Sequence, residues 1–324
     1  MPITLKSLLS LPLFESFEEE PRKLSYLMRH GEILRYAPGL KVLSEGEQGD
    51  GALFLVYEGS VGIAKLVDPE NKRAKNLGII RTGDFFGEMS LLEAAPYSAT
   101  VFTLEETTLV KITARAFSEL AATDTRLSSS LLFSLIRAIS DRLRKTNTEV
   151  VILYETGKIL SSIAELNAMA RALLDRVCGS LRIPYGALVV YNELSGQYEL
   201  AASIGEDFDF SDDLNHELIR ELKTNGRGFR FPLDDLGVEL LDRLSKSQFC
   251  SVMAVPLLRY EKVYGAMVLA HPKETSTASA TEFSDFEYNL VLGVAQQASF
   301  AVENARNREE EAARQAYSRR SKKI

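Results

Sequence analysis

The sequence predicts an α+β protein of two domains joined by a long helix, and three observations support this prediction. The chain has 324 residues, a length that suits two domains at about 150 residues each. Between about residues 31 and 112, short alternating apolar stretches are separated by glycines, which is typical of an antiparallel barrel or sandwich. Between about residues 157 and 304, helical and strand-like stretches alternate.

The composition indicates a soluble globular protein and disfavours general nucleic-acid binding. Hydrophobic residues make up 45% of the chain and charged residues 26%. The 45 acidic residues outnumber the 38 lysines and arginines, so the net charge is −7 and no overall basic field attracts a polyanion. No segment is apolar over the roughly 18 residues that a transmembrane helix needs. We therefore expect a cytoplasmic protein without a membrane or nucleic-acid partner.

The cysteines and histidines predict neither disulfides nor a metal site. Cys178 and Cys250 are too few for a disulfide framework or a four-thiolate zinc site. The 3 histidines, at positions 30, 216 and 271, have no metal-ligand spacing. We expect both cysteines to be small buried side chains in a reducing compartment, and we expect no catalytic and no metal-binding residues.

The first domain, residues 1–125, is predicted to begin with a short helix that packs on its core. Lys6 and Pro12 interrupt the apolar N-terminal stretch and no small-x-small cleavage site follows, unlike in a signal peptide. The stretches 52–57 and 60–66 then alternate as strands do, with a glycine at the turn between them.

The sequence pattern over residues 126–162 predicts a connecting helix, one side of which could pack against a partner helix. The helical pattern starts near Ala114, contains no proline and has Gly157 as its only glycine. Spacings of four and three alternate along a heptad seam. The seam consists of Leu132, Ile136, Ile139, Leu143, Thr146, Val150, Leu153, Gly157 and Leu160. We expect a coiled-coil homodimer; because Thr146 and Gly157 weaken the seam, the alternative is a helix that packs only on its own domain.

The second domain, residues 163–305, is predicted to combine helices with the central strands of a sheet. A helical pattern over 166–181 precedes the first strand, and a turn is predicted at Glu261-Lys262. The predicted strands are residues 185–191, 198–203, 250–256 and 263–270. A last helix is expected from Glu282 to about Arg308, with residues 306–324 as a solvated, frayed, charged tail.

Motifs of the first domain resemble those of the cyclic nucleotide-binding domain family. The motifs are Ser44-Glu-Gly-Glu-Gln-Gly-Asp50, Leu53-Phe-Leu-Val, Glu58-Gly59-Ser-Val, Gly83-Asp-Phe-Phe-Gly-Glu-Met-Ser-Leu-Leu92 and Ser98-Ala-Thr-Val101. The resemblance covers about residues 10–145. It implies a β jelly roll with a phosphate-binding cassette and helices that move on ligand binding.

The second domain resembles a GAF domain over residues 155–305. The motifs are Val255-Pro256-Leu257, Tyr264-Gly265-Ala-Met and Ala295-Gln-Gln-Ala-Ser-Phe-Ala-Val-Glu-Asn304. The resemblance implies an α/β/α arrangement around an antiparallel sheet. The motif of cyclic nucleotide-binding GAF domains is present only in fragments, and the chain lacks the cysteine set of GAF enzymes that reduce methionine sulfoxide.

The cassette supplies the predicted ligand-binding residues, which are Gly87, Glu88, Met89, Ser90, Tyr97, Ser98 and Ala99. A glycine turn that opens a short helix points backbone N–H groups outward, which suits a phosphate. In the family, the residue matching Glu88 takes the ribose 2′-hydroxyl, and the residue matching Ser98 contacts the phosphate. Tyr97 stands where nucleotide-binding members have an arginine that pairs with the cyclic phosphate, and tyrosine has no positive charge.

The missing arginine weakens the predicted cyclic nucleotide site. An unpaired buried phosphate forfeits about 2 to 5 kcal/mol. We therefore expect cyclic AMP or cyclic GMP to bind weakly or not at all; the alternative is that the altered cassette binds another ligand. The cations considered as substitutes for the arginine are Lys41, Lys65, Arg81 and Arg137.

Together, the two resemblances imply a non-enzymatic regulatory protein that acts in signal transduction through partner proteins. One alternative is a small-molecule enzyme built on the GAF domain, against which the few cysteines and histidines argue. The other is a DNA-binding regulator of the catabolite activator type that uses the basic tail. The net charge of −7 and the lack of an evident recognition helix argue against it.

Overall fold

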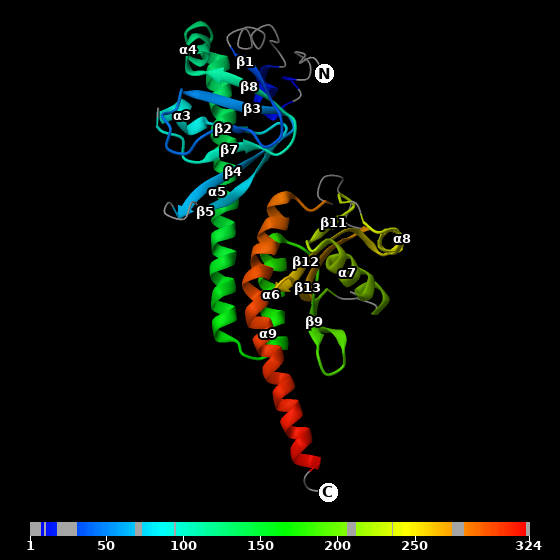
Figure 1. Ribbon diagram of the computed structural model, residues 1–324. Helices are drawn as coiled ribbons and strands as arrows, with labels where there is room; N and C mark the ends of the chain where they lie inside the picture. Colours follow the sequence, from blue (N-terminus) through cyan, green and yellow to red (C-terminus); the bar gives the residue numbers. More distant parts are fainter. Residues whose placement is uncertain are drawn as a thin grey trace. The chain divides into compact units, whose positions relative to one another are not determined.

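The computed structural model describes residues 8–9, 11–17, 31–68, 73–93, 95–205, 212–234, 236–273 and 282–321 (Figure 1). Lys6, His30 and the last three positions of the predicted tail, 322–324, lie outside these ranges. The chain divides into two compact units, Met1–Arg142 and Leu143–Ile324. Each unit has its own sheets and helices, so the predicted two-domain α+β class is confirmed.

The described part of the first unit is a sandwich of two antiparallel sheets. Its strands are β1 (Glu32–Tyr36), β2 (Lys41–Leu43), β3 (Ala52–Glu58), β4 (Ser60–Asp68), β5 (Arg73–Arg81), β6 (Phe85–Phe86), β7 (Thr100–Thr103) and β8 (Thr107–Thr113). One sheet has the order β1-β8-β3-β6 and the other β2-β7-β4-β5. This arrangement agrees with the predicted jelly roll.

Alternation along β3 places apolar side chains in two cores of the first unit. Leu53 and Leu55 face the helices, whereas Phe54 and Val56 face the second sheet. The helical side contains the 3₁₀ helix η1 (Pro12–Phe17), α4 (Ala114–Thr123) and the start of α5 (Thr125–Ser162). The N-terminal stretch therefore packs on the first core, as predicted, although in its described part Pro12–Phe17 forms a 3₁₀ helix.

The predicted helical run from Ala114 is interrupted at Asp124, so the expectation of one continuous helix is wrong. Asp124 has an extended backbone, with φ −149° and ψ 90°. Its carboxylate accepts a hydrogen bond from the backbone N–H of Leu127 at 3.1 Å, which caps the start of α5. From Thr125 to Ser162 the helix is continuous.

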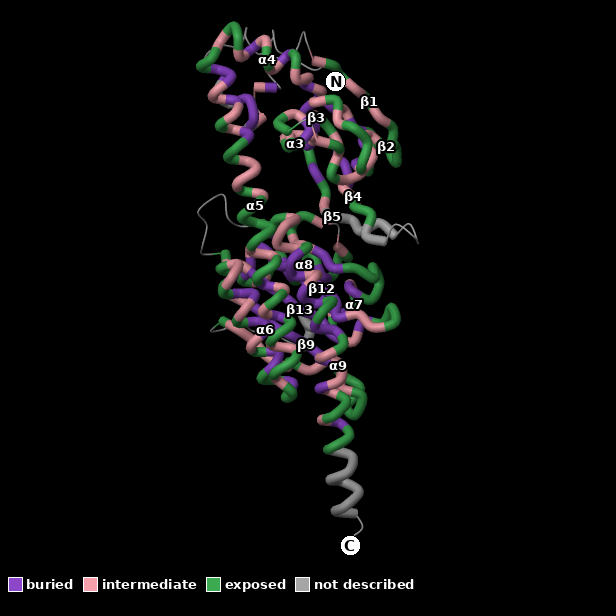
Figure 2. The backbone as a smooth tube through the Cα atoms, turned by 90° about the vertical axis from the view of Figure 1, so that its left-hand side faces the viewer, coloured by how far each residue is buried: buried purple, intermediate pink, exposed green. Residues whose placement is uncertain are grey.

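The second unit is a sheet between two layers of helices. Its strands are β9 (Tyr185–Asn192), β10 (Gln197–Ile204), β11 (Phe229–Phe231), β12 (Phe249–Arg259) and β13 (Lys262–Pro272), in the antiparallel order β10-β9-β13-β12-β11. The end of α5, α6 (Leu166–Leu181) and α9 (Asp285–Ser321) cover one face, and α7 (Asp212–Asn225) and α8 (Val238–Lys246) cover the other. In Figure 2 the buried residues gather along this sheet, so the predicted α/β/α arrangement is confirmed.

The hairpin between β12 and β13 has a two-residue turn, Tyr260-Glu261, one residue earlier than predicted. Both residues have positive φ, 45° and 65°, a conformation that hairpin turns usually give to asparagine and glycine. The Arg259 guanidinium lies 5.0 Å from the centroids of both the Tyr260 and Phe300 rings. The arginine thus stacks beside an exposed turn in an unusual backbone conformation.

Helix α9 continues to Ser321, so the expected frayed tail after about Arg308 is wrong. Arg306 pairs with Glu199 of β10 and with Glu309 and Glu310 of its own helix. The Glu310 carboxylate also accepts a hydrogen bond from the backbone N–H of Glu193 at 2.9 Å. These contacts hold the helix beyond its predicted end. None of the described helices has the length and apolar character needed to cross a lipid bilayer.

Candidate functional site

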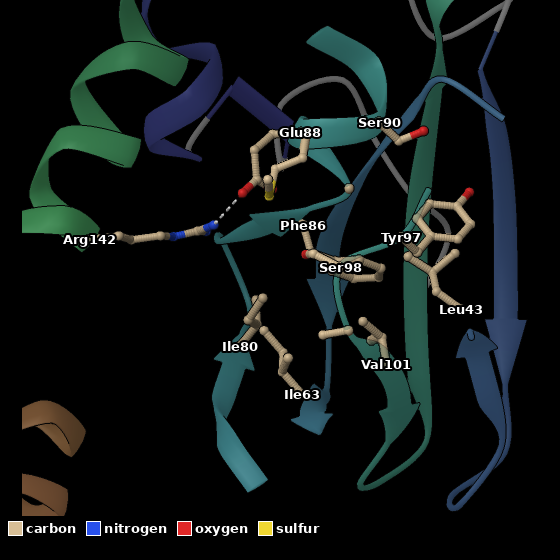
Figure 3. A pocket seen from close by; sticks show the side chains of 13 residues that line it. Leu43, Ile63, Ile80, Phe86, Glu88, Ser90, Tyr97, Ser98, Val101 and Arg142 are labelled. Atoms are coloured by element: carbon tan, nitrogen blue, oxygen red, sulfur yellow. Dashed lines mark ion pairs between the residues drawn. The ribbon is translucent and has the colours of Figure 1, made fainter. Parts of the chain in front are cut away.

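A pocket in the first unit brings the predicted ligand-binding residues together (Figure 3). All of them line it: Gly87, Glu88, Met89, Ser90, Tyr97, Ser98 and Ala99. The structure adds Leu43, Ile63, Ile80, Phe86, Val101 and Arg142 to the lining. The pocket has a volume of about 90 Å³, and about 470 Å³ when the open solvent at its mouth is included.

The apolar wall of the pocket comes from both sheets. Leu43, Ile80, Phe86 and Val101 are buried side chains of β2, β5, β6 and β7. The Phe86 ring stacks on Phe54 at 5.1 Å between centroids, with 5° between their planes. This wall suits the ring system or apolar body of a ligand.

The cassette helix α3 (Glu88–Glu93) begins directly after Gly87. Gly87 has φ +84°, and a Cβ atom there would lie 2.6 Å from the backbone oxygen of Ala52, so glycine is needed for this turn. The turn places Glu88 in the pocket lining. The Ser90 hydroxyl accepts a hydrogen bond from the backbone N–H of Gly51 at 3.0 Å and thereby ties the helix to the loop before β3.

Tyr97 contributes its ring to the pocket, but its hydroxyl is engaged outside it. The hydroxyl donates a hydrogen bond of 2.7 Å to Asp50, and Lys111 pairs with the other Asp50 oxygen at 2.8 Å. In Figure 3 the hydroxyl points away from Arg142. Tyr97 thus stands at the expected position and brings no charge to the pocket.

The pKa shifts of Tyr97, Asp50 and Lys111 are consistent with these contacts. Burial and the hydrogen bond to Asp50 raise the pKa of Tyr97 to about 12, so the phenol stays neutral. Burial raises the pKa of Asp50, but hydrogen bonds from Lys111 and Tyr97 outweigh it and leave the pKa below its ordinary value. The hydrogen bond to Asp50 raises the pKa of Lys111. Asp50 and Lys111 therefore form an ion pair, and Glu32 lies a further 3.8 Å from the lysine.

The cation that lines the pocket is Arg142 of α5, which is not among the four cations expected from the sequence. Its Nη1 lies 3.8 Å from the Glu88 carboxylate, and its Nη2 pairs with Asp84 and donates to the backbone carbonyl of Phe85. None of the four cations considered from the sequence lines this pocket. Arg142 belongs to the helical run, about 50 residues after the cassette. No local sequence motif indicates that Arg142 lies beside the cassette in the folded chain.

The cysteines form no disulfide. Burial raises the pKa of the Cys178 thiol to about 12, and a nearby Asp175 adds to the shift. The Cys250 thiol lies 3.4 and 3.3 Å from the backbone carbonyls of His271 and Pro272. Within the described ranges, no group of three or more His, Cys, Asp or Glu residues is arranged to hold a metal ion.

Comparison with known proteins identifies both units. Residues 33–124 match the family model of the cyclic nucleotide-binding domain, and residues 165–302 match that of the GAF domain. The chain is 30% identical over 152 residues to the cAMP-activated global transcriptional regulator Vfr of Pseudomonas aeruginosa, a match that covers 45% of this chain and 68% of that protein.

Two further matches are with a curated protein and a solved domain. The cyclic AMP receptor protein of Thermus thermophilus is 29% identical over 212 residues, covering 65% of this chain and 86% of that protein. A solved cyclic nucleotide-binding domain from Methylobacillus flagellatus is 25% identical, with a TM-score of 0.38, and covers 43% of this chain and 76% of that one. With its cassette, sandwich and sequence matches, the chain belongs to the cyclic nucleotide-binding domain family and carries a GAF domain as its second unit.

Proposed function

We propose that the protein is a non-enzymatic regulator in which helix α5 senses a small ligand bound in the pocket of the first unit. The observation that carries this proposal is the position of Arg142, which belongs to α5 and lies 3.8 Å from Glu88 in the pocket lining. A ligand that contacts either side chain changes the interactions of α5. It can thereby shift an equilibrium between two arrangements of that helix.

A cyclic nucleotide is the first candidate ligand. Two relatives are named as a cAMP-activated regulator and a cyclic AMP receptor protein, and this chain keeps the glycine turn, Glu88 and Ser98 of the cassette. Tyr97 provides no charge for the cyclic phosphate. We therefore expect cyclic AMP to bind only weakly to this chain, if it binds at all.

The exposed side of α5 supports the proposal that the regulator is a homodimer. Ile136, Leu143 and Val150 of the predicted seam are 54%, 59% and 60% exposed. Leu131 and Leu135, on another side of the helix, are buried in the core of the first unit. An apolar stripe at heptad spacing that its own unit leaves uncovered suits a second copy of α5.

The output is proposed to be contact with partner signalling proteins rather than chemistry. The buried Cys178 thiol stays protonated, and the Cys250 thiol faces two backbone carbonyls, so both suit structural roles better than nucleophilic ones. The two units combine a ligand-binding cassette with a GAF domain. This pairing suits a protein that converts ligand binding into altered helix packing.

A DNA-binding regulator is the second candidate, and the names of the relatives favour it. Vfr is named as a transcriptional regulator. In this chain, residues 165–302 match a GAF domain. A gel shift of the full chain on mixed duplex DNA, with and without cyclic AMP, distinguishes the two candidates: retarded DNA at physiological salt supports the second one.

Hydrogen exchange of the full chain tests the coupling between pocket and helix. With millimolar cyclic AMP or adenosine, we expect slower exchange in α3 and around Arg142 in α5. In an Arg142→Gln variant, protection of α3 should persist while the change in α5 disappears. Protection of α3 in the unmodified chain without any change in α5 would contradict the proposed sensing role.

A further inference from the structure

The charged side chains around the pocket disfavour an anionic ligand. Glu88 and Arg142 line the pocket, and Arg142 is shared with the carboxylate of Asp84. This cluster therefore holds two carboxylates and one guanidinium. At the opposite side, Tyr97 is neutral, and Lys111 is paired with Asp50 at 2.8 Å and with Glu32 at 3.8 Å, so no cation is left for an anionic ligand there.

Arg142 is poorly placed to serve a phosphate. Besides its pairing with Asp84, it donates to the backbone carbonyl of Phe85 and lies 4.5 Å from the centroid of the Phe85 ring. An anion that approached Arg142 from the pocket would meet the Glu88 carboxylate, which lies on the same side. Like charges at that distance repel, and the partly buried setting screens them less than water would.

Glu88, by contrast, has acceptor capacity left. Among the described residues its partner is Arg142, at 3.8 Å, which is longer than a hydrogen bond. Its side chain is 19% exposed. A carboxylate accepts hydrogen bonds through two oxygens and donates none, so it suits ligand hydroxyl groups.

We infer that this pocket takes a neutral nucleoside-type ligand, a ring system with hydroxyl groups and no phosphate. The hydroxyls would donate to Glu88, and the ring would pack on the apolar wall of Leu43, Phe86 and Val101. The pKa of Tyr97, raised to about 12, keeps the other side of the pocket uncharged at neutral pH. The inference rests on the proposed function, since it names the ligand class of the same pocket.

Calorimetric titration of the full chain with adenosine and cyclic AMP compares the same ring and sugar without and with the cyclic phosphate. We expect adenosine to bind at least as tightly as cyclic AMP. A preference for cyclic AMP of more than about threefold would overturn the inference. Binding of neither compound would overturn it as well.

Two further arms test the role of Glu88. Glu88→Gln should weaken adenosine about tenfold, because a hydrogen bond to a charged group is lost. The exposed Glu93, on the same helix, provides the matched control, and Glu93→Gln should change nothing. On the unmodified chain, 2′,3′-dideoxyadenosine should bind about tenfold more weakly than adenosine. Equal affinities of the two nucleosides would overturn the inference.

The outcomes separate this inference from the proposed function. If cyclic AMP binds more tightly and alters hydrogen exchange in α5, the sensing role stands and the nucleoside inference is wrong. If adenosine binds as expected but leaves α5 unchanged, the ligand class stands and the sensing role is wrong.

Discussion

Among single residues, Tyr97 determines the electrostatic character of the pocket most directly. Its ring forms part of the lining, while its hydroxyl is held by Asp50, which Lys111 neutralises. A long side chain at position 97 can therefore reach the Asp50 carboxylate as well as the pocket. Any attempt to restore the arginine of the family must take Asp50 into account.

Tyr97→Arg alone is expected to improve cyclic AMP binding by less than about threefold, because the new guanidinium pairs with Asp50. Combining Tyr97→Arg with Asp50→Asn removes this competitor. The double variant should then bind cyclic AMP about 10- to 100-fold more tightly than the unmodified chain, the usual contribution of a charged hydrogen bond. Calorimetric titration of the full chain measures both values.

Asp50→Asn alone serves as the control for this experiment and should leave cyclic AMP binding unchanged. A large gain from Tyr97→Arg alone would show that Asp50 does not compete. No gain in the double variant would show that the phosphate cannot reach this side of the pocket.

The stability contributed by Asp50 should disappear in acid. A carboxyl whose pKa is lowered by folding stabilises the folded state above its unfolded pKa, and this contribution is lost as the pH falls through its folded pKa. The difference in unfolding free energy between the unmodified chain and Asp50→Asn should thus be constant near neutral pH and shrink below about pH 4. Because the Asp50 side chain is 45% exposed, we expect a difference of less than about 1 kcal/mol. Urea unfolding at several pH values measures it; a difference that grows in acid contradicts the assignment.

The cassette residues were predictable from the sequence, whereas Arg142 was not. Gly87, Glu88 and Ser98 belong to two neighbouring sequence motifs, and the turn at Gly87 depends on local chemistry. Arg142 reaches the pocket only because α5 packs on the first core through Leu131 and Leu135. Such a contact depends on tertiary structure, and no spacing within the sequence encodes it.

Among the elements, α9 departs most from its prediction. The charged residues after Asn304 suggested a solvated tail, yet Arg306 is only 14% exposed and joins α9 to β10 through Glu199. The Glu309 carboxylate accepts a hydrogen bond from the backbone N–H of Leu166, at the start of α6. Charge composition predicts solvent exposure only when the charged side chains have no oppositely charged or hydrogen-bonding partner elsewhere in the chain.

Arg306→Gln should loosen this end of the second unit. The substitution leaves the carboxylates of Glu199, Glu309 and Glu310 close together without their cation. Hydrogen exchange of the β9 and β10 amides is expected to report a fall of about 2 to 3 kcal/mol in the free energy of local opening. Arg308→Gln is the matched control, since Arg308 is exposed on the same helix. Equal effects of the two substitutions would show that the ion pairs contribute little.

The helix break at Asp124 shows how local chemistry can outweigh a continuous apolar pattern. The periodicity from Ala114 onward predicts one helix, but an aspartate followed three residues later by an N–H donor forms an N-cap. The sequence contains this signal at Asp124. It competes with the apolar periodicity, and the capped arrangement prevails in the structure.

For the molecule as a whole, α5 is the element that both units share. Its first part contributes Leu127, Leu131 and Leu135 to the core of the first unit, and its later part contributes Ile152 to that of the second. Sequence periodicity was sufficient to predict the long helix, and its heptad seam stays a prediction. It could not show which residues of the helix the chain itself buries, because heptad seams and ordinary core stripes share nearly the same spacing.

Replacing Leu143 and Val150 by aspartate should convert a dimer into folded monomers. Both side chains are more than half exposed, so their loss does not disturb the core of the unit. Light scattering at micromolar concentration should give half the mass of the unmodified protein, with an unchanged circular dichroism spectrum. Asn147→Asp, an exposed substitution on the same helix, should leave the mass unchanged. A monomeric unmodified protein would contradict the dimer.

The turn at Tyr260-Glu261 also makes the second unit a target for protein engineering. Two residues with side chains occupy left-handed backbone conformations there. Each lowers the free energy of unfolding by about 1 to 2 kcal/mol relative to a residue suited to that region. Asparagine and glycine at these positions should raise the melting temperature of the unit, while removal of the Tyr260 ring takes away one surface of the Arg259 stack. The turn thus holds an exposed aromatic side chain in a backbone conformation that asparagine and glycine adopt more readily. A library that varies only these two codons would show whether that side chain is under selection for something other than folding.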